Sequence, residues 1–408
     1  MKYLTFFLIL FLFGCSKTQD QPNQKPNLNL SFTTNGLELQ LSGSSTDNDG
    51  VVTDISINWG DNKVNRFSNN DFLQLLFNHT YLNPSTYEII VTATDDAGDS
   101  TSFILNVVVD FKETSLAGVK QTLFKKEAGE YLVLTINLHT YQESQQNEKF
   151  NLLTDVIGLM DIDFIAFQEC AQHKTAPVFE GIIREDNMAL EISRRLRKKY
   201  NIDYSYVWAW SHYGWEVWEE GVAVMSKFPL IDHDDRYVST ATGTNTISSR
   251  TVIYAAYQIP EGNMHIFSAH THWRTSLNDV EQNRQIDKIK AMADEKEVIG
   301  NPVFSIVCGD FNVNPTSDFP WSEGYFRMVR DDIFQDSFLA IYPDANNKPA
   351  QAIYNTIGGN LPGRIDYIFN KVNPHLIILD SQIIFTPGII GKVSDHSGVL
   401  TKIKILYK

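Results

Sequence analysis

The stretch "SIVCGDFNVNP", Ser305 to Pro315, joins an apolar run to a polar end. Ile306, Val307 and Cys308 read as a buried strand that stops at Gly309, and Asp310 and Asn312 follow with one residue between them. Residues two apart on an extended chain face the same way, so these two side chains can enter one cleft. An ordinary turn is the alternative, because Gly, Asp and Asn are common turn residues.

The rest of the chain from Tyr131 to Lys408 alternates between strand and helix patterns. "YLVLTINLHT", "IDFIAFQEC", "TVIYAAYQI" and "MHIFSAHTHW" are rich in β-branched and aromatic residues, as strands are. Apolar residues recur at helical spacing in 148–160, and helices are also expected over 185–200 and 279–295. This alternation predicts a layered α/β domain.

Polar residues of catalytic type follow most of these strands. They are Asn137, Glu169, His270, His272, Asp310, Asn312, Asp366, Asp395 and His396. Sites in α/β domains lie at strand ends, and carboxylates with histidines suit metal-assisted hydrolysis. Any one of these residues alone is more typical of a cap, a turn or an ion pair, so the prediction of a site depends on the whole set.

The ordered motifs N, QE, EG(V)A, TH, GDFN, RIDYIF and SDH resemble the endonuclease/exonuclease/phosphatase superfamily. Its members include deoxyribonuclease I, abasic-site endonucleases, neutral sphingomyelinases and inositol polyphosphate 5-phosphatases. The resemblance implies an α/β fold, a four-layer α/β sandwich of two packed β-sheets flanked by helices. It also implies a divalent metal, usually Mg²⁺, with Mn²⁺ or Ca²⁺ as alternatives.

The resemblance implies roles for the acidic and amide residues. Glu169 corresponds to the principal metal ligand, with Asn137 and Asp395 beside it. Asp310 corresponds to the group that orients or deprotonates the attacking water, and Asn312 to one that holds this water or the phosphate.

The histidine roles are also carried over from the resemblance. His396 corresponds to the residue that binds phosphoryl oxygens, oriented by Asp366. His272 fits the second catalytic histidine, with Glu220 as its partner, as in the deoxyribonuclease I branch. The family usually has Asn where this chain has His270, which leaves His270 as a substrate-binding contender.

Residues 28–112 form a separate all-β pattern of short alternating strands and turns. The pattern predicts an immunoglobulin-like sandwich. It resembles a PKD domain through Asp49-Gly50, Trp59-Gly60-Asp61, His79-Thr80-Tyr81, Tyr87 and Asp95 to Gly98. The resemblance implies a spacer or adhesion module without catalysis. Residues 113–128 are predicted to be a linker to a second domain at 129–408.

The first residues have the layout of a secretion signal, with Lys2 before the apolar run Leu4 to Phe13. The end at Cys15 resembles a bacterial lipoprotein signal, which implies lipidation of Cys15 and a polar tether at 16–27. We therefore expect an extracytoplasmic protein, anchored by lipid to a cell-envelope membrane at the outer membrane or cell surface. A plain secretion signal is the alternative. Cys170 and Cys308 are expected to be small buried residues.

The formal net charge of −15 argues against broad, charge-driven binding of nucleic acid. It does not exclude an enzyme that binds phosphate locally through a metal. The segment "SYVWAWSHYGWEVWEEG" contains Trp208, Trp210, Trp215 and Trp218. These side chains either fill a sheet face or form a stacking or lipid-contacting surface.

Together these features predict a metal-dependent phosphoesterase, a hydrolase that uses metal-activated water. A nuclease-like phosphodiesterase is favoured. A sphingomyelinase or phospholipase C-like enzyme, and an inositol phosphate phosphatase, are the alternatives, and a non-catalytic adhesin is a third class. The expected partners are a phosphate-ester substrate (nucleic acid, phospholipid or a small phosphoester) and a membrane reached through the anchor, and no protein partner is predicted.

Overall fold

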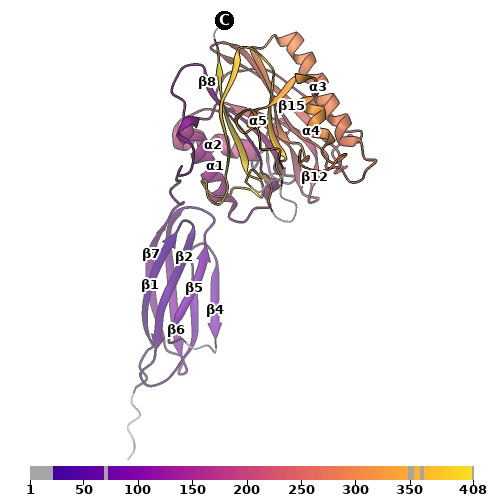
Figure 1. Ribbon diagram of the computed structural model, residues 1–408. Coiled ribbons are helices and arrows are strands. Elements are labelled where there is room, and N and C mark those ends of the chain that lie inside the picture. The colour runs from indigo at the N-terminus through magenta and orange to yellow at the C-terminus, as the bar shows by residue number, and fades with distance from the viewer. Residues whose placement is uncertain (1–21, 69–71, 348–352, 359–362, 407–408) are drawn as a thin grey trace, which may run out of the picture. The chain divides into compact units, whose positions relative to one another are not determined.

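A computed structural model describes residues 22–68, 72–347, 353–358 and 363–406 (Figure 1). The chain divides into two compact units, one up to Lys112 and the other from Glu113 onward. The predicted signal and Cys15 lie outside the described residues. No helix within the described ranges is both long and apolar enough to cross a membrane.

The first unit is a sandwich of two antiparallel sheets, as predicted. One sheet has the order β1-β2-β5 and the other β4-β3-β6-β7. The strands are β1 (Asn27–Asn35), β2 (Glu38–Thr46), β3 (Val52–Asn58), β4 (Val64–Ser68), β5 (Leu75–Thr80), β6 (Ser85–Asp95) and β7 (Ser100–Val109). Apolar side chains from both sheets form a single buried cluster between them.

The motif residues of this unit bind one another. Tyr81 is buried and its hydroxyl donates to the carbonyl oxygen of Trp59 at 2.9 Å. The His79 ring stacks on Trp59 with centroids 4.6 Å apart, and its Nε2 lies 2.9 Å from a carboxylate oxygen of Asp61. These residues therefore stabilise the core of the sandwich.

The second unit contains two six-stranded sheets (Figure 1). The first has the order β12 (Ser205–Gly214), β13 (Trp218–Ser226), β9 (Phe164–His173), β8 (Glu130–Asn137), β21 (Gly398–Ile405) and β20 (Leu376–Ile384). The second has the order β14 (Leu230–Tyr237), β15 (Thr251–Ile259), β16 (Gly262–His270), β17 (Phe304–Asp310), β19 (Asp366–Lys371) and β18 (Phe334–Asp336). An apolar cluster with members from both sheets, including Ala166 and Ile306, lies between them.

Helices cover the outer face of each sheet, which completes the predicted four layers. Helices α1 (Gln146–Met160) and α2 (Met188–Tyr200) share a buried cluster with strands of the first sheet. Helices α3 (Glu281–Gly300) and α4 (Glu323–Val329) share another with strands of the second. The remaining elements are η1 (Gln121–Leu123), η2 (His139–Tyr141), β10 (Val178–Glu180), β11 (Ile183–Arg184), η3 (Arg330–Asp332) and α5 (Ser337–Ile341).

The segment 113–128, which was predicted to be a linker, does not connect two units. It belongs to the second unit. Val119 and Leu123 are buried in the cluster under α1 and α2. Lys120 donates from Nζ to a carboxylate oxygen of Asp380 at 2.8 Å. The apolar residues Leu116, Val119, Leu123 and Phe124 are scattered among polar and charged residues without a complete strand or helix pattern, so the sequence does not reveal this packing.

Two parallel strand pairs bring the functional ends together. β8 pairs in parallel with β9, and β16 pairs in parallel with β17; α1 and α3 form the respective crossovers. Parallel pairing aligns carboxyl ends, so His270 lies in register with Asp310. The antiparallel strand β19 begins opposite Asp310 at Asp366.

Gly309 allows β16 and β17 to approach at this edge. A Cβ atom placed on Gly309 would lie 1.9 Å from the carbonyl oxygen of Ala269 on β16, closer than any van der Waals contact. The glycine that ends the apolar run therefore sets the distance between β16 and β17, and the position of Asp310 depends on that distance.

We predict that Gly309→Ala destabilises the second unit by about 3 kcal/mol or more, because the added methyl group must displace backbone. Urea denaturation followed by tryptophan fluorescence measures this loss. Gly388→Ala is the matched control, since a Cβ there meets nothing within 4 Å. Equal midpoints for the two variants would contradict the role assigned to Gly309.

Candidate active site

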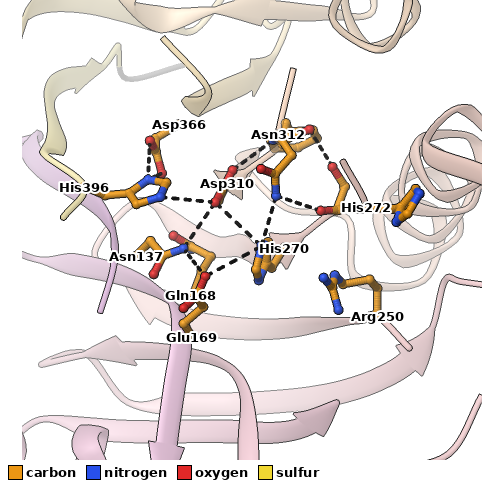
Figure 2. Close-up of polar contacts among 12 residues, drawn as sticks. Asn137, Gln168, Glu169, Arg250, His270, His272, Asp310, Asn312, Asp366 and His396 are labelled. Carbon is orange, nitrogen blue, oxygen red and sulfur yellow. Dashed lines mark hydrogen bonds and ion pairs between the residues drawn. The ribbon is translucent and has the colours of Figure 1, made fainter. Parts of the chain in front are cut away.

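A cavity of about 400 Å³ opens at the edge where these strands end. It is lined by Glu169, His212, Trp215, Glu220, Ile247, Arg250, His270, Trp273, Asp310, Asn312 and His396. Both sheets contribute to this lining, and Figure 2 shows how the polar groups face one another.

Asn137 connects carboxylates from the two sheets. Its Nδ2 donates to Oε1 of Glu169 at 2.9 Å and to Oδ2 of Asp310 at 3.1 Å (Figure 2). Its Oδ1 accepts from the backbone N–H of His139 at 2.9 Å, which fixes the orientation of the amide. Glu169 has a left-handed φ of 46°, which is uncommon outside glycine.

Asp310 and Asn312 enter the same site, as their spacing suggests. The backbone N–H of Asn312 donates to Oδ1 of Asp310 at 2.9 Å, while Asn312 Nδ2 donates to the Thr271 carbonyl oxygen at 3.0 Å. Asn312 has a φ of 49°, so the chain reverses locally and is not extended through 312. A tight turn after the strand therefore brings both side chains into one cleft. Both interpretations of this stretch, the shared cleft and the turn, are correct.

His396 and Asp366 form a buried pair. The Nδ1 of His396 lies 2.9 Å and 3.1 Å from the two carboxylate oxygens of Asp366. Its Nε2 lies 3.8 Å from Oδ2 of Asp310. Burial disfavours the imidazolium, but the charges of Asp366 and Asp310 outweigh it and raise the pKa of His396 to about 10.

The carboxyl groups of the cavity are crowded together in a desolvated place. Burial, followed by the charge of Glu220, raises the pKa of Glu169 to about 8. Burial, followed by the charge of Asp366, raises the pKa of Asp310 to about 7. Burial and the nearby Arg250 lower the pKa of His270 well below its ordinary value.

The predicted pairing of His272 with Glu220 is wrong. His272 Nε2 lies 2.9 Å from a carboxylate oxygen of Asp279, and its ring lies apart from the carboxylate cluster in Figure 2. Glu220 instead lies 3.1 Å from Nε2 of His212, and its other oxygen accepts from Thr140 at 2.8 Å. Between the two histidines at 270 and 272, only His270 lines the cavity.

Asp395 does not share a donor cluster with Glu169. Its carboxylate is half-exposed, and Oδ1 lies 3.5 Å from Nδ1 of His139. Asp395, His139 and Glu143 form a separate group of potential ligands at the edge of the site. Family position alone placed Asp395 beside Glu169, and the three successive left-handed residues of η2 were not visible in the sequence.

Sequence reasoning missed two buried residues of the cavity, His212 and Arg250. The register between β12 and β13 shifts between Trp210 and His212, and such a bulge redirects side chains. The Arg250 side chain is buried and its Nη1 donates to the Ile247 carbonyl oxygen at 2.7 Å. A histidine inside the tryptophan-rich segment was the only available signal for the first, and none was evident for the second.

The tryptophan-rich segment contributes to both the core and the cavity. Trp208 is buried in the core, while Trp210 and Trp218 pack against it partly buried. Trp215 is about half-exposed and lines the cavity. Cys170 and Cys308 are buried and unpaired, as expected.

Comparison with known proteins identifies the class. The model of the Endonuclease/Exonuclease/phosphatase family matches residues 134–396, and that of the PKD domain matches residues 25–109. The chain therefore belongs to the endonuclease/exonuclease/phosphatase family and has an N-terminal PKD domain. Members of this family are hydrolases of phosphate esters and commonly use divalent metals.

Solved structures agree with this assignment. A family protein from Leptotrichia buccalis C-1013-b is similar with a TM-score of 0.58 and 25% identity, over 67% of this chain and 100% of that one. A second, from Beutenbergia cavernae DSM 12333, has a TM-score of 0.52 and 17% identity, over 68% and 72%. No curated protein sequence matches the chain.

The donor atoms of the cavity fit a divalent cation. Glu169, His270 and Asp310 each offer one ligand atom, and these atoms lie within 4.8 Å of one another. Two of the three are carboxylate oxygens, which divalent cations bind readily. A cation there would also offset the mutual repulsion of the buried carboxylates.

We predict that the metal-free protein becomes less stable as the pH rises from about 5 to 9. Glu169 and Asp310 have folded pKa values of about 8 and 7, above the unfolded values of about 4. Between these limits the native state binds more protons, so stability falls as they are lost. His396 acts in the same direction between about 6.5 and 10, because its folded pKa is raised.

Calorimetric melts in EDTA across this pH range test the prediction. Asp310→Asn should flatten the decrease, since it removes one of the titrating carboxyl groups and a charge that supports His396. Parallel pH profiles for the wild-type protein and the variant would contradict it.

Proposed function

We propose that this chain is an extracytoplasmic, divalent-metal-dependent phosphodiesterase with nuclease-like activity. The observation that carries the proposal is the position of the Asp310 carboxylate. It lies between the Asn137–Glu169 pair and the His396–Asp366 pair, and Oδ2 is 3.1 Å from Asn137 Nδ2 and 3.8 Å from His396 Nε2. Membership of the family supports phosphate-ester hydrolysis.

Glu169 would hold the cation, together with a neighbouring donor. The expected ligand role of Asn137 does not fit, because its amide nitrogen faces Glu169 and Asp310 and its oxygen accepts from the His139 N–H. When bound, a divalent cation neutralises charge on the phosphoryl oxygens and favours attack at phosphorus. Asn137 Nδ2 already donates to Glu169 Oε1, and this bond orients the carboxylate toward Asp310. The chain thus holds the main ligand in place before substrate arrives.

Asp310 would accept the proton of the attacking water. In the metal-free cavity burial raises its pKa to about 7, so this carboxyl is more basic than an ordinary aspartate and better able to take a proton. The N–H of Asn312 and the amide of Asn137 each hold one of its oxygens. The carboxylate is therefore oriented, and its free lone pairs face the cavity.

His396 would bind the phosphoryl oxygens as negative charge develops on them. Asp366 accepts from Nδ1, which leaves the protonated Nε2 directed toward Asp310 and the cavity. The raised pKa of His396 keeps the ring cationic at neutral pH. A positive charge already fixed where charge develops lowers the barrier without reorganisation.

The walls of the cavity support a substrate with flat apolar groups. Trp215, Trp273 and Ile247 line it and are each about half-exposed or more. Bases of single-stranded nucleic acid stack on such indole rings. The same surface would also contact lipid, so a sphingomyelinase-like activity is the second candidate.

The first experiment compares substrates with the full-length protein, in Mg²⁺ or Mn²⁺ and in EDTA. Plasmid DNA, single-stranded DNA, RNA, sphingomyelin vesicles and inositol polyphosphates are each incubated with wild-type protein and with Asp310→Asn. We expect metal-dependent cleavage of a nucleic acid, reduced about 10²- to 10⁴-fold in the variant, which is the usual contribution of a general base.

Asp344→Asn is the matched control, because Asp344 is exposed and hydrogen-bonds only to the nearby Asn347 among the described residues. This variant should retain full activity. Cleavage of sphingomyelin alone would favour the second candidate. Failure to cleave any substrate, in protein shown to be folded, would contradict the proposed function.

We also propose that Cys15 carries the lipid anchor, on the basis of the lipoprotein-like signal that precedes it. Cys15→Ser should move the protein from the membrane fraction to the soluble fraction and abolish incorporation of labelled fatty acid. Cys170→Ser is the control, because Cys170 is buried. Unchanged membrane association of Cys15→Ser would contradict the anchor.

A further inference from the structure

Arg250 places a buried guanidinium group at the wall of the cavity. The residue immediately precedes β15, lines the cavity and is 2% exposed. Figure 2 shows its guanidinium end directed toward the carboxylate cluster. Arginine is almost never fully buried unless its charge and its N–H groups are paired, so the partners of Arg250 decide what it does.

The protein uses only one of the guanidinium nitrogens. Nη1 donates to the carbonyl oxygens of Ile247 at 2.7 Å and of Ser249 at 3.1 Å, which takes both of its hydrogens. Nε is buried without a hydrogen-bond partner, and Nη2 has no hydrogen bond among the described residues. Of the five N–H groups of arginine, those on Nε and Nη2 therefore remain unused.

The positive charge of Arg250 is also unpaired. Glu220 is the carboxylate whose charge acts most strongly on Arg250, but it is bonded to His212 and Thr140 instead. The ring of Trp273 has its centroid 5.6 Å from Cζ, and this contact attracts the charge without accepting a hydrogen bond in the guanidinium plane. Burial lowers the pKa of Arg250, yet an arginine stays protonated in a protein. A buried cation without an ion pair favours the entry of an anion.

His270 does not offer a donor from Nε2 to such an anion. Nδ2 of Asn312 donates to the Thr271 carbonyl oxygen at 3.0 Å and lies 3.0 Å from Nε2 of His270. Nε2 must then accept, which makes it the unprotonated nitrogen of a neutral ring.

His212 is already occupied at both ring nitrogens. Nε2 lies 3.1 Å from Oε1 of Glu220, and Nδ1 lies 2.9 Å from the Ser249 carbonyl oxygen and 3.3 Å from Nη1 of Arg250. A carbonyl oxygen only accepts, so Nδ1 carries a proton and takes no hydrogen bond from Arg250. Among the described residues that line the cavity, Arg250 is therefore the only side chain that combines a fixed positive charge with unused N–H donors.

We propose that Arg250 binds a phosphate group of the substrate, with Nη2 as the donor to a phosphate oxygen. The inference rests on the proposed function and adds a residue that holds the substrate. Arginine suits this task because its charge is permanent and its N–H groups lie in one plane, which matches the geometry of phosphate oxygens. His396 and Arg250 lie on opposite sides of Asp310 in Figure 2, so the two cations would contact different oxygens of the substrate.

The alternative role for Arg250 is structural, because its bonds to the Ile247 and Ser249 carbonyl oxygens hold the segment before β15. That role uses Nη1 alone and leaves Nε and Nη2 without partners. A neutral amide is also able to donate to a carbonyl oxygen. A purely structural role therefore predicts a loss of stability without a loss of phosphate affinity.

Titration calorimetry with inorganic phosphate, in the presence of Mg²⁺, tests the proposal on the full-length protein. Arg250→Gln should lower phosphate affinity at least about tenfold, because a charge-assisted hydrogen bond is lost. Arg250→Lys should lower it less, since it retains the positive charge. Arg236→Gln is the matched control: Arg236 lies on β14, is paired with Asp234 and Glu295, and is outside the cavity lining. It should bind phosphate as the wild-type protein does.

The KM for single-stranded DNA distinguishes a phosphate of the substrate from free phosphate. We expect KM to rise at least about fivefold in Arg250→Gln and to stay unchanged in Arg236→Gln, because a lost substrate contact weakens binding. A loss of phosphate affinity with an unchanged KM would assign the site to free phosphate and overturn the substrate role. Melting curves would show that each variant is folded.

These outcomes separate the inference from the proposed function. If the wild-type protein cleaves DNA while Arg250→Gln alters neither phosphate affinity nor KM, the inference is wrong and the proposed function stands. If both Arg250 variants only lower the melting temperature, the role of Arg250 is structural. If the wild-type protein cleaves no substrate, the proposed function fails, and the inference about a substrate phosphate fails with it.

Discussion

The two hydrogen bonds from the Asn137 amide hold the active edge of the second unit together. One goes to Glu169 within the first sheet, and the other crosses to Asp310 in the second sheet. Carboxylates buried side by side repel each other unless polar hydrogens or cations lie between them. A single amide that donates to both reduces this repulsion, and the bond from the His139 N–H to its oxygen keeps it from rotating. Asn312 and His396 lie against the same Asp310 carboxylate, and Asp366 in turn lies against His396.

The electrostatic balance of the cavity is incomplete within the protein. Glu220 lies beside His212, and Asp366 beside His396, so each of these carboxylates has a nearby histidine. Glu169 has no cationic side chain closer than His270 at 4.0 Å among the described residues, and His270 is neutral by its hydrogen bonding. Within the described residues, Glu169 is therefore a buried carboxyl group without a cationic partner, and its raised pKa reflects this lack.

The amino-acid sequence was sufficient to predict the layers of the fold and the residues at the centre of the cavity. Apolar strand patterns that end in polar motifs predicted β9, β15, β16 and β17, and the motifs placed Glu169, Asp310 and His396 at one edge. Charged or short elements such as β14 and β18 were not predicted, because their side chains lack the period that marks a half-buried strand.

Other features depend on contacts between distant segments, which a linear pattern does not encode. His212 enters the cavity through a bulge in β12, and the choice between His270 and His272 depends on where β16 ends. The burial of Val119 and Leu123 depends on a cluster built by strands of the first sheet together with α1 and α2. In each case the local sequence allows several positions of the side chain, and tertiary packing selects one of them.

The pairing of β8 with β9 and of β16 with β17 gives the second unit two similar halves, each a strand, a helical crossover and a parallel strand. Each half supplies one carboxylate to the centre, Glu169 from one and Asp310 from the other. Neither half can form the site by itself, so the site exists only when the halves have docked. A cation bound by both carboxylates would stabilise the docked state of the two halves. Its binding free energy would oppose separation of the sheets, because it binds only when both carboxylates are in place.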